Sequence, residues 1–452
     1  MRSVGLAVVL ALAFAGGASA EVVAPGVQDG MLAEMPNGTP LVAYLHGNSL
    51  RVAVRTAPGR WHTTRGRAVA PGSTLVGFAA GVAGSVALIR GPDDRVLTLL
   101  RRPVGAWIPT SVVGSLPAGT TLGWPGLVLD RRGLPVVSYT RWHRSTHRSA
   151  LIVARLDARG GVRSARITTE GFPKSHVAPP AAPVLVRGRV HVIETYGFDG
   201  AVGTIDWTRK KRTWEGQFID AGIGDFPVGP LFAAVGPGGT VYAAWSHVLF
   251  ALNGVPVSLA VRGRSISSDV VLDRALTTGL AATTAGPEVA GNEWLAADEV
   301  GLPGTGTAWA GELAGHGRRI ELDGWLADLA AAPNGARDLL LARPGGPLSW
   351  FRSPRPPMIR VSVDAAVGGG GAVVVSGRVR GAAHGGAAHG RVTIYRERPG
   401  SARQPVGTTT LAADGSFSLV DHPPLRPLLY RAVYIAPSTG IPYAALLRDP
   451  VR

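Results

Sequence analysis

Short apolar runs, each preceded by a glycine turn, recur along most of the chain. Runs of this length, bounded by Gly, Pro and Asn, are typical of β-strands. Successive glycines are 44 to 55 residues apart, which predicts a repeated β unit. The seven copies begin at Gly38, Gly84, Gly133, Gly188, Gly239, Gly291 and Gly335.

A second apolar run follows most copies across a short polar turn, so each repeat is expected to contain a β-hairpin. In three repeats a tryptophan closes this second run, at Trp61, Trp107 and Trp214. A tryptophan at a recurring position favours packing between neighbouring sheets over ligand recognition. The second runs are residues 50–54, 96–100, 150–154, 248–252 and 348–351.

The repeat length leaves room for four short strands, and a sheet of that size cannot bury both of its faces alone. Radial stacking of such sheets covers each face and leaves only short edges exposed. In period and hairpin pattern, residues 30–355 resemble the repeats of β-propellers, although no sialidase-type Asp box and no Trp-Asp dipeptide is present. We therefore expect an all-β fold with a propeller over residues 21–351. Seven blades are expected, with six as the alternative because residues 286–311 are the least regular; a linear β-solenoid is the competing arrangement.

The remainder of the chain predicts a separate small β-sandwich over residues 358–452, after a proline-rich linker at 352–357. Residues 413–418, the pair Pro423 and Pro424, and residues 430–434 resemble the later strands of bacterial immunoglobulin-like or carboxypeptidase-regulatory-like domains. This resemblance implies an accessory spacer or docking module, with Tyr430 as the tyrosine of a corner motif. The expected strands are residues 359–363, 372–379, 391–395, 406–411, 416–420, 430–435 and 443–447.

The first twenty residues have the pattern of a cleavable secretory signal. Arg2 is followed by an apolar run at 4–14 and by Ala18-Ser19-Ala20 before Glu21. The run is shorter than the roughly 20 residues that span a bilayer, and no later segment reaches that length. We therefore expect a signal peptide at 1–20 and a secreted or cell-surface bacterial protein, monomeric and without a transmembrane segment after signal removal.

Cysteine content limits the possible catalytic and metal-binding chemistry, and net charge indicates the kind of partner. The chain has no cysteine, which excludes disulfides, thiolate nucleophiles and thiolate metal sites. Its formal net charge is +16, and an exported protein of this charge favours acidic polysaccharide, cell-wall polymer or anionic lipid rather than nucleic acid. A protein partner is an alternative, and no cofactor or metal is expected.

Two basic clusters are the candidate binding residues. The first, in the third repeat, combines cationic side chains for an anion with an indole for stacking, and the second is expected in the equivalent hairpin of the fourth repeat. If the hairpins are equivalent, both clusters lie on one rim of the propeller; solvated hairpin tips would explain the same residues. The clusters are Arg141, Trp142, His143, Arg144 and Arg148, and Arg209, Lys210, Lys211 and Arg212.

No local enzyme motif is present: the sequence lacks a Gly-x-Ser-x-Gly elbow, a His-Glu-x-x-His helix, a P-loop and a dinucleotide-binding fingerprint. Acidic residues gather around the fourth repeat, but their spacing selects no catalytic pair; they are Asp199, Asp206, Glu215, Asp220, Asp225, Asp298 and Glu299. Our first hypothesis is a binding or scaffold protein whose rim docks an acidic glycan, wall polymer or protein. The alternative is a secreted glycan-active hydrolase or lyase, distinguished by carboxylates, His or Tyr converging at the propeller axis. A purely structural surface module is the third hypothesis.

Overall fold

The computed structural model describes most of the 452-residue chain. All structural statements below concern residues 20–27, 29–102, 106–146, 148–171, 178–198, 201–220, 226–249, 255–263, 269–272, 275–283, 286–293, 308–312, 319–331, 336–343, 346–353, 359–381, 388–397, 403–424, 428–447 and 451. Regular structure in these residues consists of β-strands and short 3-10 turns. Among them no helix has the length and apolarity needed to cross a membrane.

Antiparallel sheets follow one another in chain order, and their strands follow the order of the sequence except where β1 joins the last sheet of the propeller. Sheet 1 contains β2 (Met31–Glu34), β3 (Pro40–His46), β4 (Ser49–Ala57) and β5 (Arg60–Thr63), with β6 (Arg67–Ala68) paired to β4. Sheet 2 contains β7 (Thr74–Gly81), β8 (Gly84–Arg90), β9 (Leu97–Arg102) and β10 (Ile108–Val113). In sheet 3, β11 (Thr120–Leu122) and β12 (Gly126–Leu129) both pair with β13 (Pro135–His143), which is followed by β14 (Arg148–Leu156) and β15 (Val162–Gly171).

The next sheets repeat this plan. Sheet 4 contains β16 (Ala181–Val186), β17 (Arg189–Phe198), β18 (Ala201–Lys210) and β19 (Thr213–Asp220). Sheet 5 contains β20 (Phe226–Val235), β21 (Val241–Leu249), β22 (Val255–Arg262) and β23 (Asp269–Leu272). Sheet 6 begins with β24 (Ala275–Thr283), β25 (Gly286–Glu293), β26 (Ala308–Glu312) and β27 (Arg319–Leu322). Sheet 7 contains β28 (Trp325–Ala331), β29 (Arg337–Ala342), β30 (Leu348–Ser353) and, from the other end of the described chain, β1 (Glu21–Ala24).

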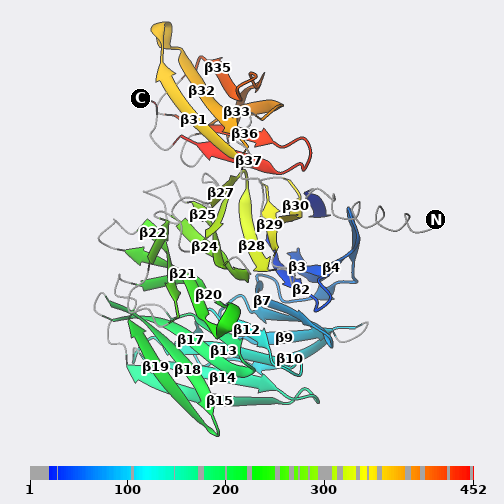
Figure 1. Cartoon of the computed structure of the whole chain (residues 1–452). Helices are drawn as coiled ribbons and strands as arrows, with labels where there is room; N and C mark the ends of the chain where they lie inside the picture. The colour runs from blue at the N-terminus through cyan, green and yellow to red at the C-terminus, as the bar shows by residue number, and fades with distance from the viewer. Residues whose placement is uncertain are drawn as a thin grey trace, which may run out of the picture.

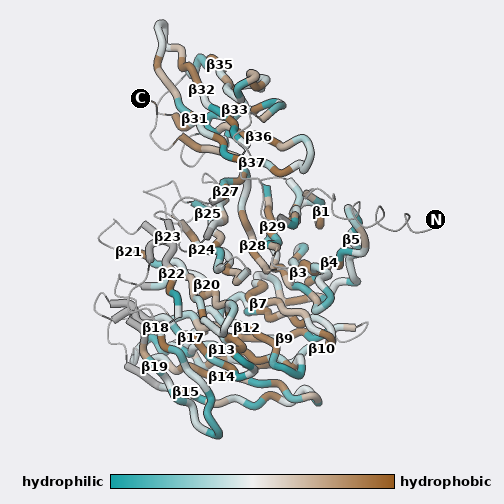
Figure 2. The backbone as a smooth tube through the Cα atoms, in the orientation of Figure 1, coloured by the Kyte–Doolittle hydropathy of each residue, from teal (hydrophilic) through white to brown (hydrophobic). Residues whose placement is uncertain are grey.

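The sheets close into a ring through their first strands (Figure 1). β2 packs against β7, β7 against β12, β12 against β16, β16 against β20, β20 against β24, and β24 against β28. β28 in turn packs against β2, so the series returns to its start. Hydrophobic stretches run along the middle of strands such as β9 and β14, where neighbouring sheets cover them (Figure 2). The fold is therefore an all-β propeller, in which each sheet shields the faces of its neighbours.

The predicted repeat coincides with the second strand in sheets 1 to 5, and Gly335 of the seventh copy lies outside the described residues. The described glycines of five copies lead into β3, β8, β13, β17 and β21, and Gly133 and Gly188 have φ of 73° and 75°, which favours glycine. The sixth copy was misplaced: Gly291 lies inside β25, and the strand begins at Gly286. The Gly- and Ala-rich sequence there offers no single turn signal. In the fifth repeat, the predicted second run at 248–252 was also wrong, because residue 248 still belongs to β21 and the next strand is β22.

The recurring tryptophans pack between sheets, as expected. Trp61 and Trp214 lie in the fourth strand of sheets 1 and 4, and Trp107 directly precedes that strand in sheet 2. The Trp61 ring meets Trp350 of sheet 7 edge to face, with 5.6 Å between centroids. Trp214 joins the apolar cluster between sheets 3 and 4.

The C-terminal unit contains the seven predicted strands, in two sheets. One sheet orders its strands β31-β32-β35, and the other β37-β36-β33-β34. Tyr430, predicted as a corner tyrosine, is buried, and its hydroxyl donates a 2.8 Å hydrogen bond to Asp421. The strands are β31 (Arg360–Val367), β32 (Val373–Arg380), β33 (Arg391–Glu397), β34 (Gln404–Thr410), β35 (Ser416–Asp421), β36 (Leu429–Ile435) and β37 (Pro442–Leu446).

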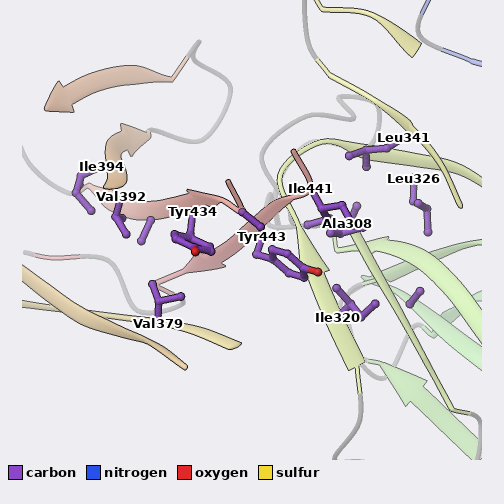
Figure 3. Close-up of a cluster of buried hydrophobic side chains, with 14 of the residues drawn as sticks. Ala308, Ile320, Leu326, Leu341, Val379, Val392, Ile394, Tyr434, Ile441 and Tyr443 are labelled. Carbon is purple, nitrogen blue, oxygen red and sulfur yellow. The ribbon is translucent and has the colours of Figure 1, made fainter. Parts of the chain in front are cut away.

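This unit is joined to the propeller by a continuous sheet. Edge strand β37 pairs with β27 through Tyr443 and Leu322, and the Asp323 N–H donates a 2.8 Å hydrogen bond to the Pro442 carbonyl. Tyr443 and Ile320 belong to one apolar core that extends into both units (Figure 3). The predicted linker began too early, because β30 continues to Ser353 and Arg352 pairs there with Asp338. Residues 354–357 of that linker lie outside the described residues.

Candidate functional site

Strand direction divides the propeller into two faces. Because each sheet is an antiparallel meander, the turn between its second and third strands lies at one end, together with the connection into the next sheet. The turns between first and second strands and between third and fourth strands lie at the other end. We call these ends the front face and the back face.

The first predicted cluster lies on the front face, at the β13–β14 hairpin. Arg144 and Arg148 are exposed there, and His143 Nδ1 lies 3.2 Å from the Ser145 hydroxyl. Arg141 lies over the Tyr139 ring at 5.8 Å from its centroid. Trp142 is only 5% exposed, so its indole is packed within the blade and offers no open face for stacking.

The second predicted cluster lies on the back face, at the β18–β19 hairpin. Arg209, Lys211 and Arg212 are exposed, and Lys210 forms a 2.5 Å ion pair with Glu215. The prediction of one shared rim is therefore wrong. The β13–β14 turn joins second and third strands, whereas the β18–β19 turn joins third and fourth strands. The sequence shows two basic hairpins but not which strand pair each one connects.

Two carboxyl groups that the sequence did not single out lie at the ring seam between sheets 7 and 1. Asp29 lies two residues before the inner strand β2, and Asp328 lies in the inner strand β28. One oxygen of Asp328 accepts a 2.7 Å hydrogen bond from the backbone N–H of Leu32, and the other accepts a 2.8 Å bond from the N–H of Leu329. Asp328 thereby links the two inner strands that close the ring.

The local backbone makes room for this carboxyl. The register between β28 and β29 shifts from Leu326 to Asp328, as in a β-bulge, which re-aims the side chain. On the other side, Gly279 of β24 has no side chain where a Cβ would lie 3.4 Å from Asp328 Oδ1 and 2.8 Å from the Leu329 nitrogen. The Asp328 carboxyl thus fits between three inner strands.

Burial and mutual repulsion alter the acidity of this pair. Burial raises the pKa of Asp328 to about 7, the negative charge of Asp29 adds to the rise, and the two N–H donors oppose it. Asp29 is exposed to the solvent of the pocket, yet the protein atoms around it still displace enough water to raise its pKa, against the 2.8 Å hydrogen bond from the Gly30 N–H. Of the two carboxyl groups, Asp328 has the larger rise in pKa, so it is the one that titrates near neutral pH.

Asp29 also opens into a front-face pocket. The pocket has a volume of about 340 Å³ and lies between sheets 1 and 2, with the Asn48, Ser73 and Thr74 side chains in its lining. Asp328 is not among the residues that line the pocket, and it interacts with Asp29 through charge. The sequence signal for this site is a lone Asp within the otherwise apolar β28.

A larger groove of about 780 Å³ lies on the back face beside sheet 4. Lys210, from the predicted basic cluster, lines it together with Asp206 and Glu215, two of the carboxylates noted in the sequence. The side chain of Asp220 and residues 199, 225, 298 and 299 are outside the described residues. Within the described ranges, no group of three His, Asp or Glu is arranged to hold a metal ion.

Comparison with known proteins assigns the chain to no family. No family model and no curated protein matches the chain. Among solved structures, the α-L-arabinanase of Penicillium chrysogenum complexed with arabinobiose is 9% identical, with a TM-score of 0.40, covering 74% of this chain and 97% of that one. The β-propeller domain of the Trilobed protease from Pyrococcus furiosus is 7% identical, with a TM-score of 0.42 and coverage of 74% and 96%. The GH93 α-L-arabinofuranosidase of Fusarium graminearum is 11% identical, with a TM-score of 0.40 and coverage of 74% and 97%. At such values, neither substrate nor residue roles transfer to this chain.

Proposed function

We propose that the protein is an exported, glycan-active hydrolase or lyase whose site is the front-face pocket at Asp29. The observation that carries this proposal is the pair of carboxyl groups where the ring closes: Asp29, two residues before β2, lines the pocket, and its negative charge raises the pKa of Asp328 in β28. Convergence of carboxylates near the axis was the feature that would distinguish an enzyme from a binding protein. Enzymes that cleave sugar chains by acid–base catalysis commonly use two carboxyl groups whose environments give them different pKa values.

Asp29 is the proposed catalytic residue, because it lines the pocket and can reach a bound saccharide. It transfers a proton to or from the sugar at the bond that breaks, while Asn48, Ser73 and Thr74 hold sugar hydroxyls. Asp328 is the proposed positioning residue. Its charge state near neutrality sets how readily Asp29 accepts or releases that proton.

The proposed substrate class is an acidic glycan. Arg144 and Arg148 are exposed on the same face as the pocket, and guanidinium groups bind carboxylate or sulfate in a bidentate manner. The formal net charge of +16 would raise the local concentration of such a polymer around the whole protein.

The proposal includes seven blades, a cleaved signal at 1–20, a monomer and an immunoglobulin-like C-terminal module. The closed contact series from β2 to β28 supports the blade number. The sheet orders β31-β32-β35 and β37-β36-β33-β34 support the immunoglobulin-like assignment. Cleavage before Glu21 is supported by the position of this residue, which is the first of the ring-closing strand β1.

A panel of polysaccharides incubated with purified residues 21–452 tests the function. Polygalacturonate, alginate, hyaluronate and neutral arabinan are assayed for new reducing ends and for the ultraviolet absorbance of unsaturated ends, which separates hydrolysis from elimination. We expect turnover of an acidic polymer that Asp29→Asn lowers by about 10²–10⁴-fold. Asp364→Asn, an exposed carboxyl of the C-terminal unit, is the matched control and should retain full activity.

The binding hypothesis keeps one observation in its favour, the exposed arginines of the β13–β14 hairpin. It predicts salt-sensitive retention on an acidic polymer without turnover. Retention that is lost in Arg144→Glu with Arg148→Glu, together with no product from any polymer, would replace the enzyme proposal by a binding function.

A further inference from the structure

Sheet 4 has two chemically different faces. On one face, Val190, Val192, Trp207 and Trp214 pack into the apolar cluster shared with sheet 3. On the opposite face, Ile193 packs into an apolar cluster with sheet 5, but towards the back-face ends of β17, β18 and β19 the side chains on this face are polar. Strand alternation and the pairings of His191 with Thr208 and of Asp206 with Gln217 place this set on one face: Arg189, His191, Asp206, Thr208, Lys210, Glu215 and Gln217.

This polar face lines the back-face groove of about 780 Å³. Each of its seven side chains contributes to the groove, and Gly238 and Gly239 of sheet 5 form the facing wall. A propeller gains stability by covering sheet faces with apolar contacts, so an uncovered polar area at the outer part of this face is unfavourable for packing alone. Its composition is accounted for if a hydrophilic ligand occupies the groove.

An ordered polar centre stands in the middle of the groove. His191 Nδ1 lies 3.1 Å from Asp206 Oδ1 and 2.6 Å from the Thr208 hydroxyl. The His191 and Asp206 side chains are only 17% and 28% exposed, so the centre is recessed rather than solvated at a hairpin tip. Both contacts are to Nδ1, which leaves Nε2 as the ring atom for a ligand.

One end of the groove carries fixed positive charge. Arg187, with φ of 46°, donates a 3.0 Å hydrogen bond to the Gly238 carbonyl, and its own carbonyl accepts from Arg131 at 2.5 Å. These bonds tie together the first turns of sheets 3, 4 and 5. Exposed Arg189 lies next to this tied turn, while Lys210 is already paired with Glu215.

We propose that this groove is a second ligand site, for a small polyhydroxylated anion such as a uronic acid or a sugar phosphate. The anionic group binds at Arg187 and Arg189, and the hydroxyl groups bind at His191, Thr208 and Gln217. The site is on the face opposite to Asp29, so it does not depend on the proposed enzyme activity. Within an acidic polymer it would hold a chain unit remote from the cleavage pocket.

Calorimetric titration of purified residues 21–452 with glucuronate, glucose 6-phosphate and glucose tests the site. We expect one or both anions to bind, with glucose at least about tenfold weaker, equivalent to about 1.4 kcal/mol. Stronger binding of glucuronate identifies a uronate site, and stronger binding of glucose 6-phosphate identifies a phosphate site. Binding of neither anion, or equal binding of glucose, would overturn the proposal.

Variants locate the binding. Arg189→Gln and Thr208→Val should each weaken the anion at least about tenfold, with thermal unfolding unchanged because both side chains lie at the groove surface. Arg212 lies in the β18–β19 turn, next to the strand of Thr208 but outside the groove lining, so Arg212→Gln should leave affinity for the anion unchanged. Asp29→Asn should also leave it unchanged, which separates this site from the front-face pocket. Unchanged affinity in both groove variants would contradict the assignment.

Discussion

Arg55 and Glu21 join the first sheet to the strand that closes the ring. Glu21 is the first residue of β1, and its two carboxylate oxygens lie 2.6 and 2.8 Å from the Arg55 guanidinium. The Trp61 indole N–H donates a further 3.0 Å hydrogen bond to Glu21. Burial acts to raise the pKa of Glu21, but Arg55, the Gly59 N–H and Trp61 together hold it below its ordinary value.

We predict that Glu21→Ala destabilises the propeller by about 2 kcal/mol, because it leaves Arg55 without its charged partner in a partly buried site. Since the folded-state pKa is lowered, this contribution is present above the ordinary glutamate range and is lost as pH falls through the lowered value. Urea unfolding of wild type and Glu21→Ala should therefore differ at pH 7 and converge in acid. A constant difference at every pH would contradict the ionic role.

Asp328 is predicted to have the opposite pH dependence. Its pKa is raised to about 7 in the folded state, so the folded protein binds more protons than the unfolded chain between the ordinary aspartate range and neutrality. Stability is then highest in acid with respect to this group and falls as pH rises to about 7. The neutral variant Asp328→Asn should lack this loss, so its free energy of unfolding should rise relative to that of wild type by roughly 1–4 kcal/mol between pH 4.5 and 7.5, and its melting temperature should rise with it. Parallel melting curves across this range would show that Asp328 titrates normally.

Asp323 is predicted to couple the propeller to the C-terminal unit. Its buried carboxylate pairs with Arg403 and lies 4.0 Å from Arg431, and its N–H bonds to Pro442. Asp323→Ala leaves two arginines without this anion and should lower stability by about 3 kcal/mol. Differential scanning calorimetry should show one transition in the wild type and an earlier separate transition of the C-terminal unit in the variant. Asp414→Ala, which removes an exposed pairing with Arg378, is the control and should leave a single transition.

Tyr430 is predicted to stabilise the C-terminal unit through its hydroxyl. The acceptor Asp421 is buried and also receives a 3.2 Å hydrogen bond from Arg396. Tyr430→Phe keeps the ring and should cost about 1–2 kcal/mol, because the Asp421 oxygen loses one donor. Chemical unfolding followed by the fluorescence of the C-terminal unit is not suited here, since its described residues contain no Trp, so backbone circular dichroism is the measurement. A change below 0.3 kcal/mol would mean that solvent replaces the bond.

The sequence predicted the strands well because β-strand periodicity is local. A glycine with positive φ followed by an apolar run marks the second strand of a sheet, as at Gly133 and Gly188. Each C-terminal strand was found for the same reason. The start of β25 was predicted too late because residues 286–293 contain several small residues and no unique turn.

The candidate site was not predictable in the same way, because it depends on contacts between strands far apart in the sequence. Asp29 and Asp328 interact through their charges only because β2 packs against β28 where the ring closes. Hairpin position matters as well: Arg144 and Arg212 both lie in basic turns, but strand order places them on opposite faces. Trp142 was expected to stack on a ligand because basic side chains surround it in the sequence. Packing within the blade instead buries its indole.

Cleavage of acidic glycans in the pocket at Asp29, with Asp328 setting the proton affinity of Asp29, is the central proposal. The direct measurement is the pH–rate profile of kcat/KM on the polymer identified in the panel, for wild type, Asp328→Asn and Asp29→Asn. We predict that kcat/KM of the wild type changes with a midpoint near pH 7 and that this midpoint shifts in Asp328→Asn. In Asp29→Asn, kcat/KM should fall by about 10²–10⁴-fold. Wild-type rates and an unmoved profile in both variants would contradict the claim.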